Sequence, residues 1–177
     1  MSPSMTRLLP TPVGTLRLSA RGGAITRVEF AEHPRDVHGS VTASNPAVAT
    51  LDDERNAAVL TTALAELAAY FSSGPCDFRV PLAPEGTPFQ QRCWNALRHV
   101  PRGSTTTYAR LARDLGCPDA ARAVGLAMNR NPIMIMIPCH RVLGSSGSLT
   151  GYAGGLDVKR ALLDLEANAS ETLFVRA

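Results

Sequence analysis

Several features that mark membrane, secreted or metal-binding proteins are lacking in this sequence. No apolar run approaches the roughly 18 to 20 residues that span a bilayer. The first residues, MSPSMTRLLPTPVG, hold no apolar stretch long enough for a signal peptide. The four cysteines, Cys76, Cys93, Cys117 and Cys139, form no CxxC pair, which argues against a zinc ribbon or a thioredoxin-like site. We therefore expect a soluble cytoplasmic protein with free thiols, no metal and no membrane partner.

Lysine is almost absent, with one Lys against 17 Arg. The base composition of the genome alone would explain this preference for Arg over Lys. The charge is also unevenly distributed, because residues 1–85 carry a net charge of −2 and residues 86–177 carry +5, out of +3 for the chain. A mildly acidic half followed by a basic half indicates two units, the second with a polyanionic partner.

The composition is typical of a globular protein that folds without disulfide or metal support. Of the 177 residues, 45% are hydrophobic and 19% are charged, and the mean hydropathy is −0.01. The order of the elements predicts an α/β (α+β) fold. We expect a small domain of sheet and helix over residues 1–80, a linker over 81–86, and a mostly helical domain with a helix-turn-helix over 87–177.

The first unit shows a hairpin pattern followed by a helix pattern. Leu16 and Leu18 fall on one predicted strand, and apolar residues between 25 and 30 fall on a second, around Arg21-Gly22-Gly23. Residues 33–50 have no periodicity and predict a loop. Apolar residues at helical spacing then predict a helix over residues 53–72.

The second unit begins with a strong helix signal, Thr87-Pro88-Phe89-Gln90, which combines an N-cap, a first-turn proline and a capping-box glutamine. Two more helices are predicted, over residues 108–115 and 118–129, with Gly116 between them. The second of these is rich in small residues and carries Arg122, which is a helix-turn-helix pattern. An ordinary helical hairpin with a tight packing face would show the same pattern.

Cys139 is the sharpest candidate for chemistry. It follows the apolar run Ile133–Ile137, which predicts a buried strand or extended segment, and it precedes His140 and Arg141. Positive neighbours favour the thiolate, which is the reactive form of cysteine. A buried structural cysteine is the alternative, and it is our interpretation of the other three. A last helix is predicted over residues 156–167.

Together these motifs resemble the O6-alkylguanine-DNA alkyltransferase family. The resemblance is carried by segments that span residues 86–167: Thr87-Pro88-Phe89-Gln90, Tyr108, Ala121-Arg122-Ala123-Val124-Gly125, Asn131-Pro132, Ile137-Pro138-Cys139-His140-Arg141-Val142, Gly151-Tyr152-Ala153-Gly154-Gly155, Lys159 and Glu166. The Pro-Cys-His-Arg-Val core is highly specific in this context. The first 85 residues match the family only in outline.

The resemblance implies a catalytic role for five residues. Cys139 would accept the alkyl group, and His140 would take its proton through a bridging water. Glu166 would orient His140, and Asn131 would hold the turns around the active-site loop. Tyr108 would donate to the guanine base and help to rotate the nucleotide out of the duplex.

The resemblance also implies a DNA surface and a base pocket. The helix over residues 118–129 would enter the minor groove, and Arg122 would fill the space that the flipped base leaves. The other implied DNA contacts come from the same helix: Ala123, Gly125 and Asn129. The pocket would be lined by Tyr152, Val142, Ala153 and Pro138. Asn129-Arg130 stands where some members have Arg-Gly, and Ala153 where some have Ser.

The expected function is therefore direct and irreversible repair of O6-alkylguanine in double-stranded DNA by a single-turnover methyltransferase without cofactor or metal. O4-alkylthymine as a second substrate and cooperative binding of monomers along DNA stay open. Two other interpretations also stay open. A Cys-His hydrolase or acyltransferase would explain Cys139 and His140, and a non-catalytic DNA-binding regulator would explain the basic half.

Overall fold

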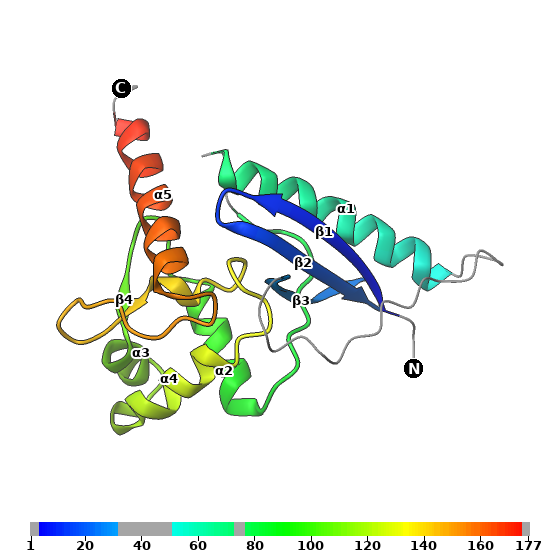
Figure 1. Cartoon of the computed structure of the whole chain (residues 1–177). Helices are drawn as coiled ribbons and strands as arrows, with labels where there is room; N and C mark the ends of the chain where they lie inside the picture. Colours follow the sequence, from blue (N-terminus) through cyan, green and yellow to red (C-terminus); the bar gives the residue numbers. More distant parts are fainter. Residues whose placement is uncertain (1–3, 32–50, 73–76, 175–177) are drawn as a thin grey trace. The chain divides into compact units, whose positions relative to one another are not determined.

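Figure 1 shows the computed structural model, which describes residues 4–31, 51–72 and 77–174. The chain divides into two compact units, Met1–Pro84 and Glu85–Ala177. The loop expected over residues 33–50 and the side chains of His33, His38 and Cys76 lie outside the described residues. None of the described helices is long and apolar enough to cross a membrane.

The first unit is built on an antiparallel sheet of three strands in the order β1-β2-β3. Its strands are β1 (Met5–Thr11), β2 (Gly14–Arg21) and β3 (Ala24–Phe30). The predicted hairpin is β2–β3, whose turn uses Gly22 and Gly23 at positive φ, a conformation that glycine adopts without strain. The sequence analysis missed β1, because this edge strand is mostly exposed and contains a proline.

Helix α1 (Leu51–Phe71) packs on this sheet and closes the core of the first unit. Alternate residues of β2 are buried, as a half-buried strand requires, and they meet the buried stripe of α1. The buried apolar residues are Leu16, Leu18, Ala20, Ile25, Val28 and Phe30 of the sheet and Val59, Leu60, Ala63, Leu67 and Tyr70 of the helix. Residues 81–83, expected in the linker, instead pair with Ile25, whose N–H donates to the Pro81 carbonyl.

The second unit contains the three helices that the motifs predicted. They are α2 (Pro88–Leu97), α3 (Tyr108–Asp114) and α4 (Ala121–Asn129), and both α2 and α3 pack on α4. The capping box of α2 is present, and the buried indole of Trp94 donates to the Ala127 carbonyl at 2.9 Å. Residues Pro118–Ala120 form a separate 3₁₀ turn, η1, so the helix predicted over residues 118–129 begins at Ala121.

The apolar run Ile133–Ile137 is buried, but the prediction of a strand or extended segment there is wrong. The chain folds back on itself, with Ile135 at φ 70° and the Ile137 N–H donating to the Ile133 carbonyl at 3.0 Å. Apolar periodicity cannot distinguish a buried strand from a buried turn. The turn leads into the short 3₁₀ helix η2 (Cys139–Arg141) and then into β5 (Val142–Leu143).

Strand β5 pairs in parallel with β4 (Thr106–Thr107), which directly precedes α3. This pairing brings the beginning of α3, and with it Tyr108, alongside the segment that follows Cys139. The last helix, α5 (Leu156–Phe174), extends past the predicted end at residue 167. Glu166 is therefore an interior position of α5 and is fully buried, not near the end of the helix.

Candidate active site

Asn131 connects the buried turn to Cys139. Its Oδ1 accepts from the Ile133 N–H at 3.0 Å, and its Nδ2 donates to the Ile137 carbonyl at 2.8 Å. The same Nδ2 lies 3.1 Å from the Cys139 Sγ. One buried amide thus holds both ends of the turn and contacts the sulfur, which fits the role that the resemblance implies.

His140, Arg141 and Glu166 form a buried charged cluster next to Cys139. Nε2 of His140 lies 2.8 Å from Oε1 of Glu166, and both side chains are fully buried. Arg141 donates two parallel hydrogen bonds to the same carboxylate, from Nε at 2.9 Å and from Nη2 at 2.8 Å. Glu166 therefore binds an imidazole and a guanidinium at once. The sequence analysis gave Arg141 no role beyond that of a positive neighbour of Cys139.

Protonation in the cluster differs from the sequence-based expectation. Burial raises the pKa of the Cys139 thiol, although the hydrogen bond from Asn131 and the charge of Lys159 oppose this. Burial likewise lowers the pKa of His140 against the pull of Glu166. The expectation that positive neighbours favour a thiolate is wrong for the resting state, because desolvation outweighs them and Arg141 is paired with Glu166. Both shifts favour a neutral thiol and a neutral imidazole near neutral pH before the reaction.

Glu166 stays ionised in this setting. Burial alone raises the pKa of a carboxyl group, but the hydrogen bonds from His140 and Arg141 hold the pKa of Glu166 well below its usual range. The backbone N–H of Gly103 also donates to Oε2, at 3.3 Å. A buried carboxylate with this many donors acts as a fixed hydrogen-bond acceptor.

Lys159, the only lysine of the chain, is fully buried on α5. Its ammonium donates to the carbonyls of Val142 at 2.6 Å and of Thr150 at 2.7 Å. Burial lowers its pKa, and its charge opposes the rise in the pKa of Cys139. A residue that is unique in an arginine-rich chain is a sequence signal for such a position, because a planar guanidinium and a compact ammonium are not interchangeable.

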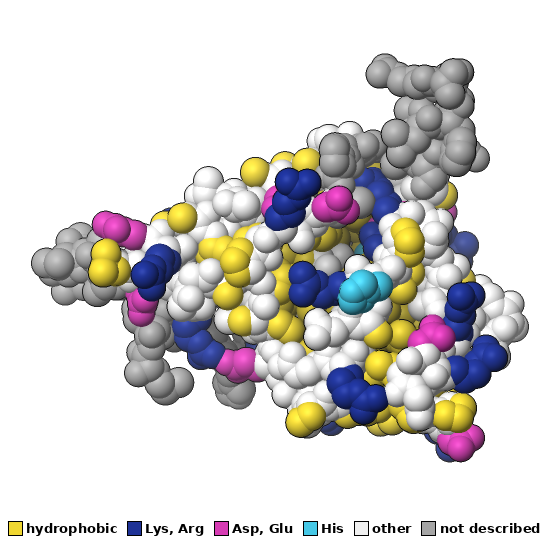
Figure 2. Space-filling model, turned by 180° about the vertical axis from the view of Figure 1, so that it is seen from behind, with side chains coloured by type: hydrophobic (Ala, Val, Ile, Leu, Met, Phe, Trp, Pro, Cys, Tyr) yellow, Lys and Arg dark blue, Asp and Glu magenta, His cyan; other side chains and the backbone are white. Residues whose placement is uncertain are grey.

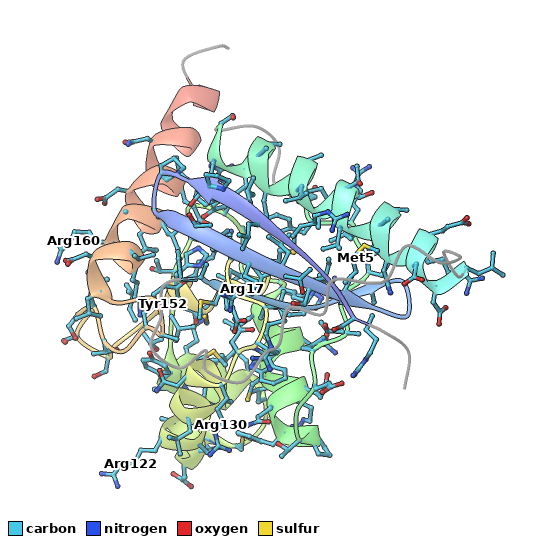
Figure 3. All side chains as sticks on the ribbon, turned by 45° about the vertical axis from the view of Figure 1, so that its right-hand side comes forward. Met5, Arg17, Arg122, Arg130, Tyr152 and Arg160 are labelled. Carbon is cyan, nitrogen blue, oxygen red and sulfur yellow. The ribbon has the colours of Figure 1, made fainter. Side chains whose placement is uncertain are left out.

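The residues expected in the base pocket lie beside this cluster. Tyr152 is buried, and its ring meets that of His140 edge-on with the ring centres 6.4 Å apart. Pro138 and Val142 flank η2 and are buried, whereas Ala153 is half-buried. Figure 3 labels Tyr152 in the loop that precedes α5. The carbonyl of Val142, one of the implied pocket groups, already accepts from Lys159.

The residues expected at the DNA surface gather on α4. Arg122, Ala123 and Asn129 are exposed, and Gly125 is half-buried. A side-chain carbon added at Gly125 would lie 3.8 Å from the ring of Tyr108, so the tyrosine of α3 lies against this face of α4. In Figure 3 the Arg122 side chain projects away from the ribbon. Sequence analysis did not single out Leu126, which is 63% exposed on the same helix.

Basic side chains also lie on other parts of the second unit. Figure 2 shows dark blue Lys and Arg side chains at the lower right of the face that it draws, with magenta acidic side chains beside some of them. In the described part of the chain, no group of three or more His, Cys, Asp or Glu side chains could hold a metal ion. The net charge of +5 over residues 86–177 suits an anionic partner that binds by charge.

Acid is expected to destabilise the second unit through His140 and Glu166. In the unfolded chain His140 takes up a proton below about pH 6.5 and Glu166 below about pH 4.5. In the folded site both groups take up a proton only at lower pH, because their pKa values are lowered there. The unfolded state then binds more protons, so the free energy of unfolding falls, by at most about 1.4 kcal/mol per pH unit for each group. Urea unfolding followed by the fluorescence of Trp94, the only tryptophan, measures this between about pH 8 and pH 5.

Two histidine variants provide the control for this measurement. His140→Gln should flatten the dependence between about pH 6.5 and pH 5, whereas His99→Gln, at an exposed position, should leave it unchanged. Equal slopes for wild type and His140→Gln would contradict the assignment.

Comparison with known proteins identifies relatives along almost the whole chain. Residues 88–168 match the family model described as 6-O-methylguanine DNA methyltransferase, DNA binding domain. The methylated-DNA–protein-cysteine methyltransferase of Mycobacterium tuberculosis (strain H37Rv) is 42% identical over 171 residues, which cover 95% of this chain and 97% of that protein. The protein of the same name from Methanosarcina acetivorans is 57% identical over 103 residues, which cover 58% of this chain and 66% of that protein.

Solved structures agree with these relatives. The O6-methylguanine methyltransferase of Mycobacterium tuberculosis matches with a TM-score of 0.78 and 40% identity, covering 97% of this chain and 99% of that one. A structure of the same organism's protein in complex with DNA matches with a TM-score of 0.78 and 41% identity, covering 96% and 98%. The chain therefore belongs to the family of methylated-DNA–protein-cysteine methyltransferases, DNA repair enzymes that bind DNA.

Proposed function

We propose that this chain repairs O6-alkylguanine in double-stranded DNA by moving the alkyl group irreversibly to Cys139. The observation that carries the proposal is the buried cluster in which Asn131 contacts the Cys139 sulfur and Glu166 binds the neighbouring His140. An exposed helix with Arg122 and small residues lies in the same unit. The relatives are named as methyltransferases that act between methylated DNA and a protein cysteine, which supports the same reaction.

In the proposed reaction a neutral thiol becomes a thioether. His140 accepts the proton of Cys139 through a bridging water at Nδ1, a buried atom with no hydrogen-bond partner among the described residues. The sulfur attacks the alkyl carbon, the bond from that carbon to the guanine oxygen breaks, and the electron pair stays on the base. The Tyr108 hydroxyl donates a proton to the departing guanine and regains one from solvent, while His140 releases to solvent the proton that it took from the thiol, so no net proton is gained or lost.

The lesion is inside the duplex, so the base has to leave the stack before it reaches a buried sulfur. Flipping costs a few kcal/mol. We infer that α4 enters the minor groove and that Arg122 fills the vacated space, while Tyr108, against Gly125, crowds the backbone of the flipped nucleotide. Tyr152 and the segments around Val142 and Ala153 would hold the base beside Cys139.

One measurement tests the proposed reaction directly. After incubation with duplex DNA that contains one O6-methylguanine, the intact protein should gain about 14 Da, the mass of a methyl group that replaces a hydrogen in a thioether. Peptide mapping should place the gain on Cys139. A mass gain at another residue, or no gain while the lesion persists in the DNA, would overturn the proposal.

Metal removal is expected to leave this transfer unchanged. Zinc sites use three or four Cys, His or carboxylate ligands, and the described residues bring no such group together. Protein dialysed against EDTA should repair O6-methylguanine duplex at the same rate and to the same extent as untreated protein. A loss that added zinc restores would contradict the expectation.

A further inference from the structure

Arg141 occupies a position that the proposed reaction does not yet use. Its guanidinium is almost completely buried and divides its donors between two parts of the second unit. Nε and Nη2 bind the two oxygens of Glu166 on α5, and Nη1 donates to the carbonyl of Val100, in the loop after α2, at 2.6 Å. Bidentate pairing of this kind fixes geometry as well as charge.

We propose that Arg141 is a positioning residue that keeps the proton of His140 on Nε2 and so leaves Nδ1 as the base for Cys139. The inference deepens the proposed function and rests on it. Arg141 does this through Glu166, without touching either the sulfur or the substrate.

The first step of the argument concerns the carboxylate. An ionised carboxylate only accepts hydrogen bonds, whereas a protonated one can donate. Both Nη2 of Arg141 and Nε2 of His140 lie 2.8 Å from Oε1 of Glu166, within hydrogen-bonding distance. With the guanidinium holding Glu166 in its ionised form, Nε2 of His140 has to be the donor. In a neutral imidazole the other nitrogen, Nδ1, then carries the lone pair.

The second step concerns charge. A lone buried carboxylate beside His140 would favour the imidazolium, which has no lone pair to accept a proton. Arg141 offsets that charge and helps to lower the pKa of His140, together with burial and Lys159. The charged and titratable groups around the ring are Glu166 and Lys159 of α5, Cys139 and Arg141 of η2, and Tyr152 in the loop before α5.

Removing Arg141 would therefore disable the base in either of two ways. The uncompensated carboxylate would draw a proton onto His140 and protonate both ring nitrogens, or it would itself take a proton and donate it to Nε2, which moves the ring proton to Nδ1. In both cases Nδ1 loses its lone pair near neutral pH. The two-donor fork of arginine is needed for the geometry, and a lysine supplies only the charge.

The test is the pH dependence of single-turnover alkylation by free O6-benzylguanine, which requires no base flipping. On the acidic limb of the wild-type profile, Arg141→Gln should react about tenfold more slowly than wild type, because this limb moves up by about one pH unit in the variant. Arg141→Lys keeps the charge, so its limb should stay near that of wild type while its rate falls at every pH. Arg160→Gln, an exposed position of α5, is the matched control and should behave as wild type.

A structural role alone would predict a different result. Misfolding lowers the reactive fraction at every pH without moving the limb, so coinciding normalised profiles for wild type and Arg141→Gln would overturn the proposal. Nitrogen NMR of His140 in the wild-type protein gives a second test that needs no variant, because a neutral ring protonated on Nδ1 would also overturn it. Failure of the proposed function looks different, since wild-type Cys139 would then gain no benzyl group whatever the tautomer.

Discussion

Cys139→Ser is expected to bind duplex DNA with an affinity close to that of wild type and to transfer no alkyl group. The hydroxyl of serine is a far weaker nucleophile than a thiol at neutral pH, and His140, whose pKa burial lowers, cannot make up that difference. The loss of transfer should exceed about a thousandfold, which is the effect of removing an essential nucleophile. The surface on α4 is unchanged, so gel-shift binding should persist.

The same reaction should stop after one event in each wild-type chain. A thioether has no carbonyl for water to attack, so nothing in the site restores the thiol. With lesion DNA in excess, the methyl groups transferred should equal the number of active chains. Cys117→Ser, a free cysteine on the turn between α3 and α4, is the matched control and should retain this stoichiometry. Repeated turnover, above all with ester substrates, would favour a Cys-His hydrolase.

The parts of the fold that the sequence predicted are those with a local cause. The capping box at Thr87, the glycines of the β2–β3 turn and the apolar stripe of α1 each determine structure within a few residues. Strand β1 was missed because it is held in place by pairing with β2, and its own sequence shows only the mostly exposed pattern of an edge strand. The turn at Ile135 was missed because a run of apolar residues has no period from which to infer a bend.

The site was predictable in part for the same reason. The residues of the Pro-Cys-His-Arg-Val core are neighbours in the chain, and family resemblance added Asn131 and Glu166. Composition could not show that Arg141 would pair with a residue 25 positions away, or that burial would reverse the expected direction of the pKa of Cys139. Both depend on tertiary packing, which decides whether desolvation or a neighbouring charge has the larger effect.

Arg122→Ala is expected to separate base flipping from chemistry. If the inserted side chain offsets about 2 to 3 kcal/mol of the flipping cost, single-turnover repair of O6-methylguanine duplex should slow by about a hundredfold. Reaction with free O6-benzylguanine should change by less than about twofold, because that substrate reaches Cys139 without leaving a stack. Tyr108→Phe should slow both reactions, since it removes a donor to the departing base.

Arg130→Ala is the matched control, because Arg130 is also exposed and directly follows α4. If Arg130 contacts a phosphate, its loss should weaken DNA binding in a salt-dependent way. The repair rate at saturating DNA should stay unchanged. An inserted Arg122, in contrast, acts on the rate at saturation, since the flipped state forms only after binding. Equal losses of rate on duplex DNA and on free O6-benzylguanine for Arg122→Ala would show that this residue supports the pocket or the fold of α4. The flipping role would then have to come from another exposed residue of α4, and Leu126 would be the first to test.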